Sequence, residues 1–189
     1  MLERDLSSFP ELRTERLVLS AVTRYDAPAL FRIRSYQRVM EHIGRPMATT
    51  IKDASDVIDR LLNEQTDNNG ITWAIAQDRD PALIGTIGYY RLKKEHYRGE
   101  VGYALHSDHW RNGIMTEALT AVLQCGSRRS RFHSIEAGTD PRSTASNAVL
   151  ERCGFVREGS FKRTSSGMAN PGTVRSIRYV HHARELRPS

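Results

Sequence analysis

The feature that most constrains the fold is a strand-like run followed by an Arg-Asn-Gly turn and a helical run. The strand-like run covers residues 100–105, the turn is Arg111-Asn112-Gly113, and the helical run covers residues 114–125. The first N–H groups of a helix have no intrahelical acceptor, and together with the helix dipole they attract anions. Because Gly113 has no Cβ, a bulky phosphate could approach the backbone closely. The segment therefore predicts a phosphate-binding turn, with an ordinary strand-to-helix connection as the alternative.

Hydrophobic periodicity along the chain predicts a single α/β domain over residues 1–189, without an internal repeat or a linker. Strands are expected at residues 16–22, 72–77, 83–92, 98–106, 133–139, 156–164 and 173–182, and helices at residues 26–36, from 51 onward, 114–125 and 144–153. Thr50 and Asp53 form the pattern of a capping box, whereas residues 1–14 are polar and expected to be loose. This order predicts a mixed sheet flanked by helices, with antiparallel strands and parallel strands combined.

The charge distribution leaves a second, non-catalytic interpretation open. The formal net charge is +6, and residues 126–189 carry 12 Lys and Arg against 5 Asp and Glu. Such a basic region could meet a polyphosphate, a nucleic acid or an acidic protein. Aromatic residues make up only 7% of the chain and no nucleic-acid-binding motif is found, so direct nucleic-acid binding is not expected.

Other features of the sequence predict a cytoplasmic protein. No apolar run approaches the roughly 18–20 residues of a membrane span, and the N-terminal residues lack the layout of a signal peptide. The two cysteines, Cys125 and Cys153, make neither a disulfide framework nor a metal-spacing motif, and free thiols are expected. No metal site is predicted, because the histidines share no spacing with carboxylates that would suggest one.

Three segments, taken in order, resemble the GNAT superfamily of acetyl-CoA-dependent N-acetyltransferases, and more closely its branch that contains the RimJ and RimL ribosomal-protein acetyltransferases. Residues 11–19 are similar to the opening strand of the branch, residues 100–118 to its pyrophosphate-binding segment, and residues 146–159 to its late helix and strand. The resemblance covers about residues 11–182. It implies a GNAT-like sheet in which antiparallel strands surround one parallel pair, and acetyl-CoA as the co-substrate.

The resemblance also implies which residues contact acetyl-CoA. These residues are Tyr103, Ala104, Leu105, Arg111, Asn112, Gly113, Ile114, Met115, Thr116, Ser143 and Ser146. The chain departs from the pattern at Trp110 and Met115, where the superfamily usually has Gln or Arg and a small residue. Ser143 stands where the family usually has an Asn, and a hydroxyl can replace only one end of an amide. Ser165 falls where RimL has a catalytic Glu.

The chemistry of acetyl transfer needs a base, an oxyanion donor and a group beside the leaving thiolate. Glu100 is the candidate base, directly or through a water, with an ion-paired or solvated strand residue as the alternative. In the fold that the resemblance implies, a strand N–H between Tyr103 and Leu105 is well placed for the oxyanion. Ser146 matches the residue proposed in the branch to serve the thiolate, and an ordinary helix-start serine is the alternative.

The sequence thus predicts an enzyme that transfers acetyl from acetyl-CoA to a primary amine. The favoured acceptor is an α-amine at a peptide or protein N-terminus, for example on a ribosomal protein, because an α-amine titrates about 2.5 pH units below a lysine. The alternatives are a small amine, such as a polyamine or an antibiotic, and a nucleotide- or RNA-binding module. A monomer and a homodimer are both compatible with the sequence.

Overall fold

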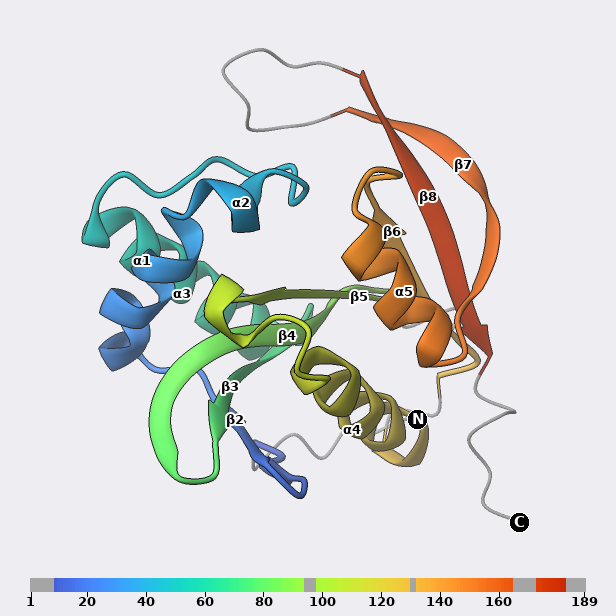
Figure 1. Cartoon of the computed structure of the whole chain (residues 1–189). Helices are drawn as coiled ribbons and strands as arrows, with labels where there is room; N and C mark the ends of the chain where they lie inside the picture. Colours follow the sequence, from blue (N-terminus) through green and yellow to red (C-terminus); the bar gives the residue numbers. More distant parts are fainter. Residues whose placement is uncertain (1–8, 94–97, 130–131, 165–172, 183–189) are drawn as a thin grey trace.

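The computed structural model describes residues 9–93, 98–129, 132–164 and 173–182, and these residues form one eight-stranded sheet (Figure 1). The strands are β1 (Leu12–Arg13), β2 (Leu17–Ala21), β3 (Ile71–Gln77), β4 (Asp80–Lys93), β5 (Arg98–Leu105), β6 (Ser134–Thr139), β7 (Val156–Thr164) and β8 (Thr173–His182). Their order in the sheet is β1-β2-β3-β4-β5-β6-β8-β7. The β5–β6 pair is parallel and the other pairs are antiparallel, which confirms the predicted mixed sheet.

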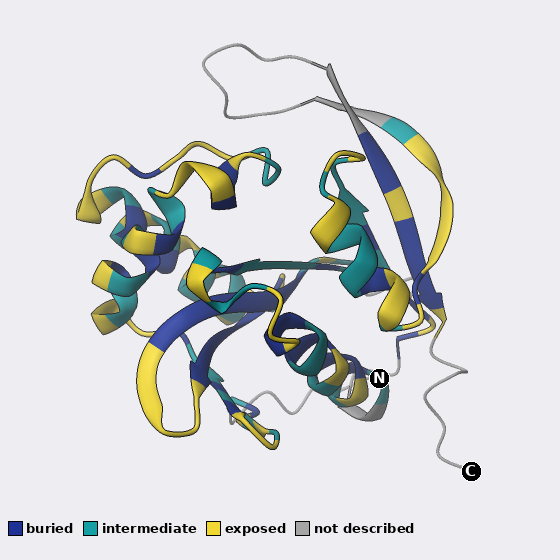
Figure 2. Ribbon diagram, in the orientation of Figure 1, coloured by how far each residue is buried: buried dark blue, intermediate teal, exposed yellow. Residues whose placement is uncertain are grey.

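Helices cover both faces of this sheet. They are α1 (Ala27–Arg34), α2 (Gln37–Met40), α3 (Ile51–Thr66), α4 (Ile114–Arg129) and α5 (Thr144–Arg152), with short 3-10 turns at Arg24–Asp26 and Ser107–His109. One apolar cluster joins the sheet to α4 and α5, and a second joins it to α1 and α3. Figure 2 shows the buried residues gathered along the central strands and on the inward sides of the helices. The sheet therefore separates two compartments, which we call the α4/α5 side and the α1/α3 side.

Two elements differ from the sequence predictions. The N-terminal segment is not loose throughout, because Leu12 pairs with Leu19 across β1 and β2, and Trp73 Nε1 donates to Pro10 O at 2.7 Å. A two-residue strand has no periodicity of its own and exists only against its neighbour. The one-turn helix α2 is held by the buried side chains of Val39 and Met40 and is too short for a helical pattern to be visible.

The start of α3 confirms the predicted capping box. Thr50 Oγ1 accepts from the amide of Asp53, and Asp53 Oδ2 accepts from the amide of Thr50 at 2.9 Å and from that of Thr49 at 2.8 Å. These bonds satisfy donors that a helix start otherwise leaves without partners. The fixed start places Ala54 and Ile58 in the apolar cluster of the α1/α3 side.

A hydrogen bond from the sheet fixes the position of α4. Tyr89 is 2% exposed, and its hydroxyl donates to Val122 O at 2.9 Å. Gly126 makes the approach possible, because a Cβ at this position would overlap the Tyr89 hydroxyl. Tyr89 is therefore a core residue, and its contact anchors the helix whose N-terminus follows the Arg-Asn-Gly turn.

Within the described part of the chain, no helix is both long and apolar enough to cross a membrane.

Candidate active site

The sheet opens in its middle, between β5 and β6. These strands pair only at Arg98 with Ser134, Gly99 with Ile135, and Glu100 with Glu136. Beyond this point β5 continues along β4 as far as Leu105, while β6 continues along β8. Among the described residues, the edge of β5 from residue 101 to residue 105 therefore has no strand beside it. An extended ligand could pair with this free edge.

The predicted phosphate-binding turn lies at the end of β5 and has an unusual backbone. Arg111 and Gly113 have φ values of +62° and +74°, so left-handed residues flank Asn112. Such a conformation costs a non-glycine residue about 1–2 kcal/mol. Within the part of the chain that the structure describes, the amides of residues 111–116 have no hydrogen-bond acceptor, and the first helical bond runs from Glu117 N to Gly113 O at 3.0 Å. The turn thus has the free donors that an anion such as a pyrophosphate requires.

The side chains that follow the turn are buried in the protein interior. Ile114 and Met115 are 3% and 6% exposed and belong to the apolar cluster of the α4/α5 side. Trp110 Nε1 donates to Leu105 O at 2.8 Å, and the Arg38 guanidinium lies 5.8 Å from the centre of the Trp110 ring. The tryptophan that departs from the superfamily pattern therefore ties the turn to the end of β5.

The two candidate catalytic residues lie on opposite faces of the sheet. Side chains alternate along a strand, and Tyr103 packs in the cluster of the α4/α5 side whereas Ala104 packs in that of the α1/α3 side. Glu100 is four residues before Ala104 on the same strand, so its side chain also faces the α1/α3 side. Ser146, in the first turn of α5, is on the side of Tyr103. The two residues can meet only through the opening between β5 and β6.

Glu100 stands at the last paired position before the opening. Arg91 Nη1 donates to Glu100 Oε2 at 2.8 Å, and the Glu100 side chain is 26% exposed. Arg91 itself has a φ of +49°, at an irregularity in the pairing of β4 with β5. The carboxylate is thus held in place and still reached by solvent. This environment is compatible with a catalytic base and also with an ion-paired strand residue.

Tyr103 and Ser146 form a hydroxyl pair on the α4/α5 side. Tyr103 Oη lies 2.9 Å from Ser146 Oγ and 3.3 Å from Ser146 O. Burial raises the pKa of Tyr103 well above its usual value, although the hydrogen bond with Ser146 opposes this effect. The phenol is therefore neutral at physiological pH and can donate to the serine, whose own proton remains available to a neighbour.

The connection from β6 to α5 completes the far wall of the opening. Ser143 precedes α5 without capping it through its side chain, while Thr139 Oγ1 donates to Asn147 Oδ1 at 2.7 Å. Asp140 is held by Arg142 and lies 3.6 Å from His42 Nδ1, which brings the segment after α2 into contact with this connection. The hydrogen bonds and charge of Arg142 lower the pKa of Asp140, despite its burial.

Two further residues contact the turn that were not predicted. Thr14 and Arg16, within the β1–β2 connection, bond to Glu117 in the first turn of α4, and Arg16 also bonds to Asn112 O in the turn. The separation of 101 residues between Arg16 and Glu117 leaves no signal in the linear sequence. Ser165, the position of the expected catalytic Glu, lies outside the described residues. Among the described residues, no group of three or more potential metal ligands comes together.

Comparison with known proteins identifies the class of proteins to which this chain belongs. Residues 16–156 match the family model of the acetyltransferase (GNAT) domain. The chain is 34% identical over 155 residues to the uncharacterized N-acetyltransferase YoaA of Bacillus subtilis, covering 82% of this chain and 88% of the relative. It is 25% identical over 167 residues to the ribosomal protein uS5-alanine N-acetyltransferase of Escherichia coli, covering 82% of this chain and 84% of that one.

A solved structure shares the fold. RimJ of Mycobacterium smegmatis, in complex with CoA-disulfide, superimposes with a TM-score of 0.79 at 24% identity, covering 95% of this chain and 89% of that one. The chain belongs to the GNAT family of acetyltransferases. It is an N-acetyltransferase, and its acetyl donor is acetyl-CoA.

Proposed function

We propose that the enzyme acetylates the α-amine of a peptide or protein N-terminus, with acetyl-CoA bound in the opening between β5 and β6. The observation that carries this proposal is that two sets of main-chain groups beside the opening are available to a ligand. The unsatisfied amides of residues 111–116 suit the pyrophosphate, and the free edge of β5 suits the extended arm of the co-substrate. The thioester would then lie near Tyr103 and Ser146, on the α4/α5 side.

The acceptor amine would enter from the α1/α3 side, where Glu100 lies. An amine attacks a thioester only as the free base, so a proton must leave it. Glu100 is three residues before Tyr103 on an extended strand, a separation of about 10 Å. A water between the carboxylate and the amine is therefore the favoured route for the proton. The Arg91 contact would keep the carboxylate directed along the strand edge.

The hydroxyl pair would serve the leaving group. With Tyr103 donating to Ser146, the serine proton is directed away from the phenol and could reach the departing sulfur of coenzyme A. A positioned acid of this kind is typically worth roughly 100- to 10,000-fold, and a hydrogen bond that does not transfer its proton is worth less. A main-chain amide on the free edge of β5, between Tyr103 and Leu105, would stabilise the oxyanion.

The choice of an α-amine rests on the relative and on acid–base chemistry. The Escherichia coli relative is named for the alanine of a ribosomal protein. The pKa of an α-amine is about 7.7–8.0 and that of a lysine is about 10.4, so far more of the α-amine is nucleophilic at neutral pH. One carboxylate would then suffice as the base, without a second group to shift the pKa of the acceptor.

A coenzyme A release assay over a panel of amines tests the proposal. The panel comprises N-terminal peptides, among them peptides that begin with alanine and serine, their N-terminally blocked lysine counterparts, polyamines and amine antibiotics. We expect turnover on the free N-terminal peptides and little on the blocked ones. Turnover confined to polyamines or antibiotics would overturn the choice of acceptor and leave the acetyltransferase activity standing. Calorimetric titration with acetyl-CoA, which needs no acceptor, checks the co-substrate separately.

A further inference from the structure

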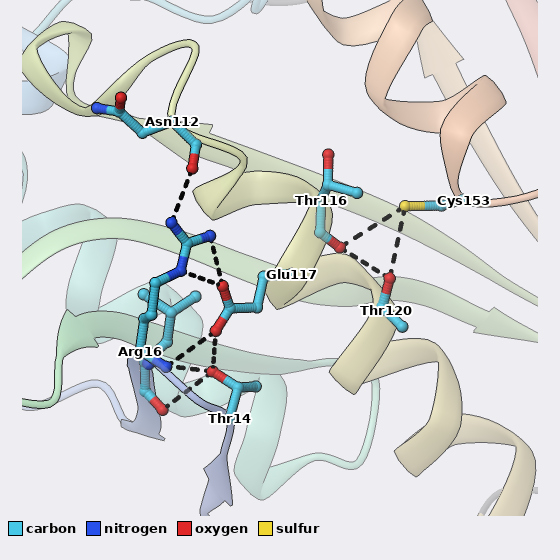
Figure 3. Close-up of polar contacts among 8 residues, drawn as sticks. Thr14, Arg16, Asn112, Thr116, Glu117, Thr120 and Cys153 are labelled. Carbon is cyan, nitrogen blue, oxygen red and sulfur yellow. Dashed lines mark hydrogen bonds and ion pairs between the residues drawn. The ribbon is translucent and has the colours of Figure 1, made fainter.

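The carboxylate of Glu117, in the first turn of α4, is enclosed by the connection between β1 and β2. Thr14 Oγ1 and the Arg16 amide donate to Glu117 Oε1, the amide at 3.1 Å. Arg16 Nε and Nη2 lie 2.7 Å and 2.6 Å from Glu117 Oε2. Figure 3 shows these contacts of Thr14 and Arg16 converging on the one carboxylate. An ion pair of this geometry, with main-chain and hydroxyl donors added, is much more restrained than a common surface pair.

Arg16 holds the phosphate-binding turn with the same guanidinium. Its Nη1 donates to Asn112 O at 3.0 Å, so one planar group binds both the turn and the helix that follows it. Asn112 is the residue between the two left-handed positions, Arg111 and Gly113. A Cβ built on Gly113 would lie 3.5 Å from Arg16 Nη2, which places the guanidinium directly behind the turn. The strained turn is therefore supported by the Arg16 side chain.

The ion pair of Arg16 with Glu117 also affects the electrostatics of anion binding at this helix start. A carboxylate in the first turn stabilises the helix dipole, but it repels a pyrophosphate that binds to the same turn. Burial would raise the pKa of Glu117, yet the hydrogen bonds from Thr14 and Arg16 outweigh this effect and lower the pKa below its usual value. Glu117 is thus charged at neutral pH, and the opposite charge of Arg16 beside it weakens the repulsion between this carboxylate and an anion at the turn.

We propose that Arg16 and Glu117 are a positioning pair for the pyrophosphate of acetyl-CoA, an inference that rests on the proposed binding of the pyrophosphate at this turn. Arg16 keeps the amides of residues 111–116 in their donating arrangement and neutralises the carboxylate that would otherwise repel the ligand. Neither residue touches the reacting atoms, so the pair acts on the binding of the donor and not on the chemical step.

The test compares two acetyl donors in the Arg16→Gln variant. Acetyl-CoA carries the pyrophosphate, and acetylpantetheine has the same thioester and arm without it. With the amine that the wild type acetylates fastest, we expect the KM for acetyl-CoA to rise at least about tenfold with kcat retained, because a lost hydrogen bond to a charged group lowers affinity by about tenfold or more. The kcat/KM for acetylpantetheine should stay at the wild-type level.

Further variants separate the charge from the geometry. Arg16→Lys keeps the charge but lacks the fork that reaches Glu117 and Asn112 O together, so it should lose part of the affinity. The double variant Arg16→Gln/Glu117→Gln has no uncompensated carboxylate and should bind acetyl-CoA more tightly than Arg16→Gln alone. Arg13→Gln is the matched control, because Arg13 lies on the same β1–β2 hairpin as Arg16, contacts Glu11 and Asp78, and has a side chain that is 65% exposed.

The outcomes distinguish this proposal from the one it rests on. If wild-type protein fails to bind acetyl-CoA in the calorimeter, the donor site itself is wrong. If the wild type binds but Arg16→Gln binds equally well, or loses activity equally on both donors, the positioning role is overturned. Should Arg16→Gln fail to fold, judged by its thermal transition, Arg16→Lys and the double variant carry the same comparison of donors.

Discussion

Tyr103 Oη and Ser146 Oγ lie 2.9 Å apart, although the two residues come from β5 and α5 and are separated by 43 positions in the sequence. The contact joins the free edge of β5 to the helix on the far side of the opening. In the proposed mode of acetyl-CoA binding, the contact lies beside the thioester that is threaded between β5 and β6. A pair of hydroxyls in this place can act as a unit, with the buried phenol orienting the serine.

The first prediction concerns this pair. Ser146→Ala should lower kcat by about tenfold, less than loss of the base, because coenzyme A thiolate is already a stable leaving group. Tyr103→Phe should lower kcat by a similar factor, and the double variant should be no worse than either single one if the tyrosine acts through the serine. Steady-state kinetics over the three variants measure the coupling. Unaltered kcat in Ser146→Ala, with Thr144→Ala as the control at the same helix start, would leave Ser146 with a structural role only.

The second prediction concerns the turn. Gly113→Val should weaken acetyl-CoA binding at least about tenfold in calorimetry, because a β-branched residue is strongly disfavoured at a φ of +74°. Its side chain would also meet Arg16. The control is Gly44→Val, at a φ of +62° in open space after α2, which carries similar backbone strain away from the turn. Equal affinity in the wild type and in Gly113→Val would remove the turn from the donor site.

The third prediction concerns the base. Glu100→Gln keeps the shape of the side chain and removes its charge, so kcat should fall by at least about 100-fold while acetyl-CoA affinity is retained. Glu136→Gln is a matched control, since Glu136 occupies the partner position on β6 and also lies near arginines, Arg98 and Arg178. We expect the control to keep its rate. Full activity of Glu100→Gln between pH 6 and 9 would rule out the carboxylate as the base.

The fourth prediction concerns stability in acid. Hydrogen bonds from the amides of Thr49 and Thr50 lower the pKa of Asp53 to about 2, against about 3.9 in an unfolded chain. A lowered pKa means that the capping interaction stabilises the fold above about pH 4 and loses this effect as the pH falls toward 2. The melting temperatures of wild type and Asp53→Asn should therefore differ at neutral pH and converge in acid. Asp56→Asn, on the exposed face of α3, should show a smaller difference, and a gap that did not depend on pH would contradict the assignment.

Short segments of the sequence were sufficient to predict a large part of this fold. Thr50 and Asp53 marked the start of α3, and the strand, turn and helix over residues 98–125 appeared in the expected order. These features depend on neighbours within about four residues, so capping and periodicity reveal them. The turn that we propose to bind the donor was recognisable for the same reason, because Gly113 and the amides after it belong to one short segment.

Contacts between distant segments were decided only by the tertiary structure. The sequence showed neither the short strand β1 nor the partnership of Arg16 with Glu117, since both exist only when β2 and α4 come together. The face of the sheet on which each candidate lies follows from which strands pair and where pairing stops. Glu100 could be proposed from its carboxylate chemistry and Ser146 from the family resemblance. Their separation by the sheet, and the opening through which they meet, depend on the divergence of β5 from β6. The chemistry of a side chain can be read from its residue type, whereas the space between two strands depends on how all the strands of the sheet pair.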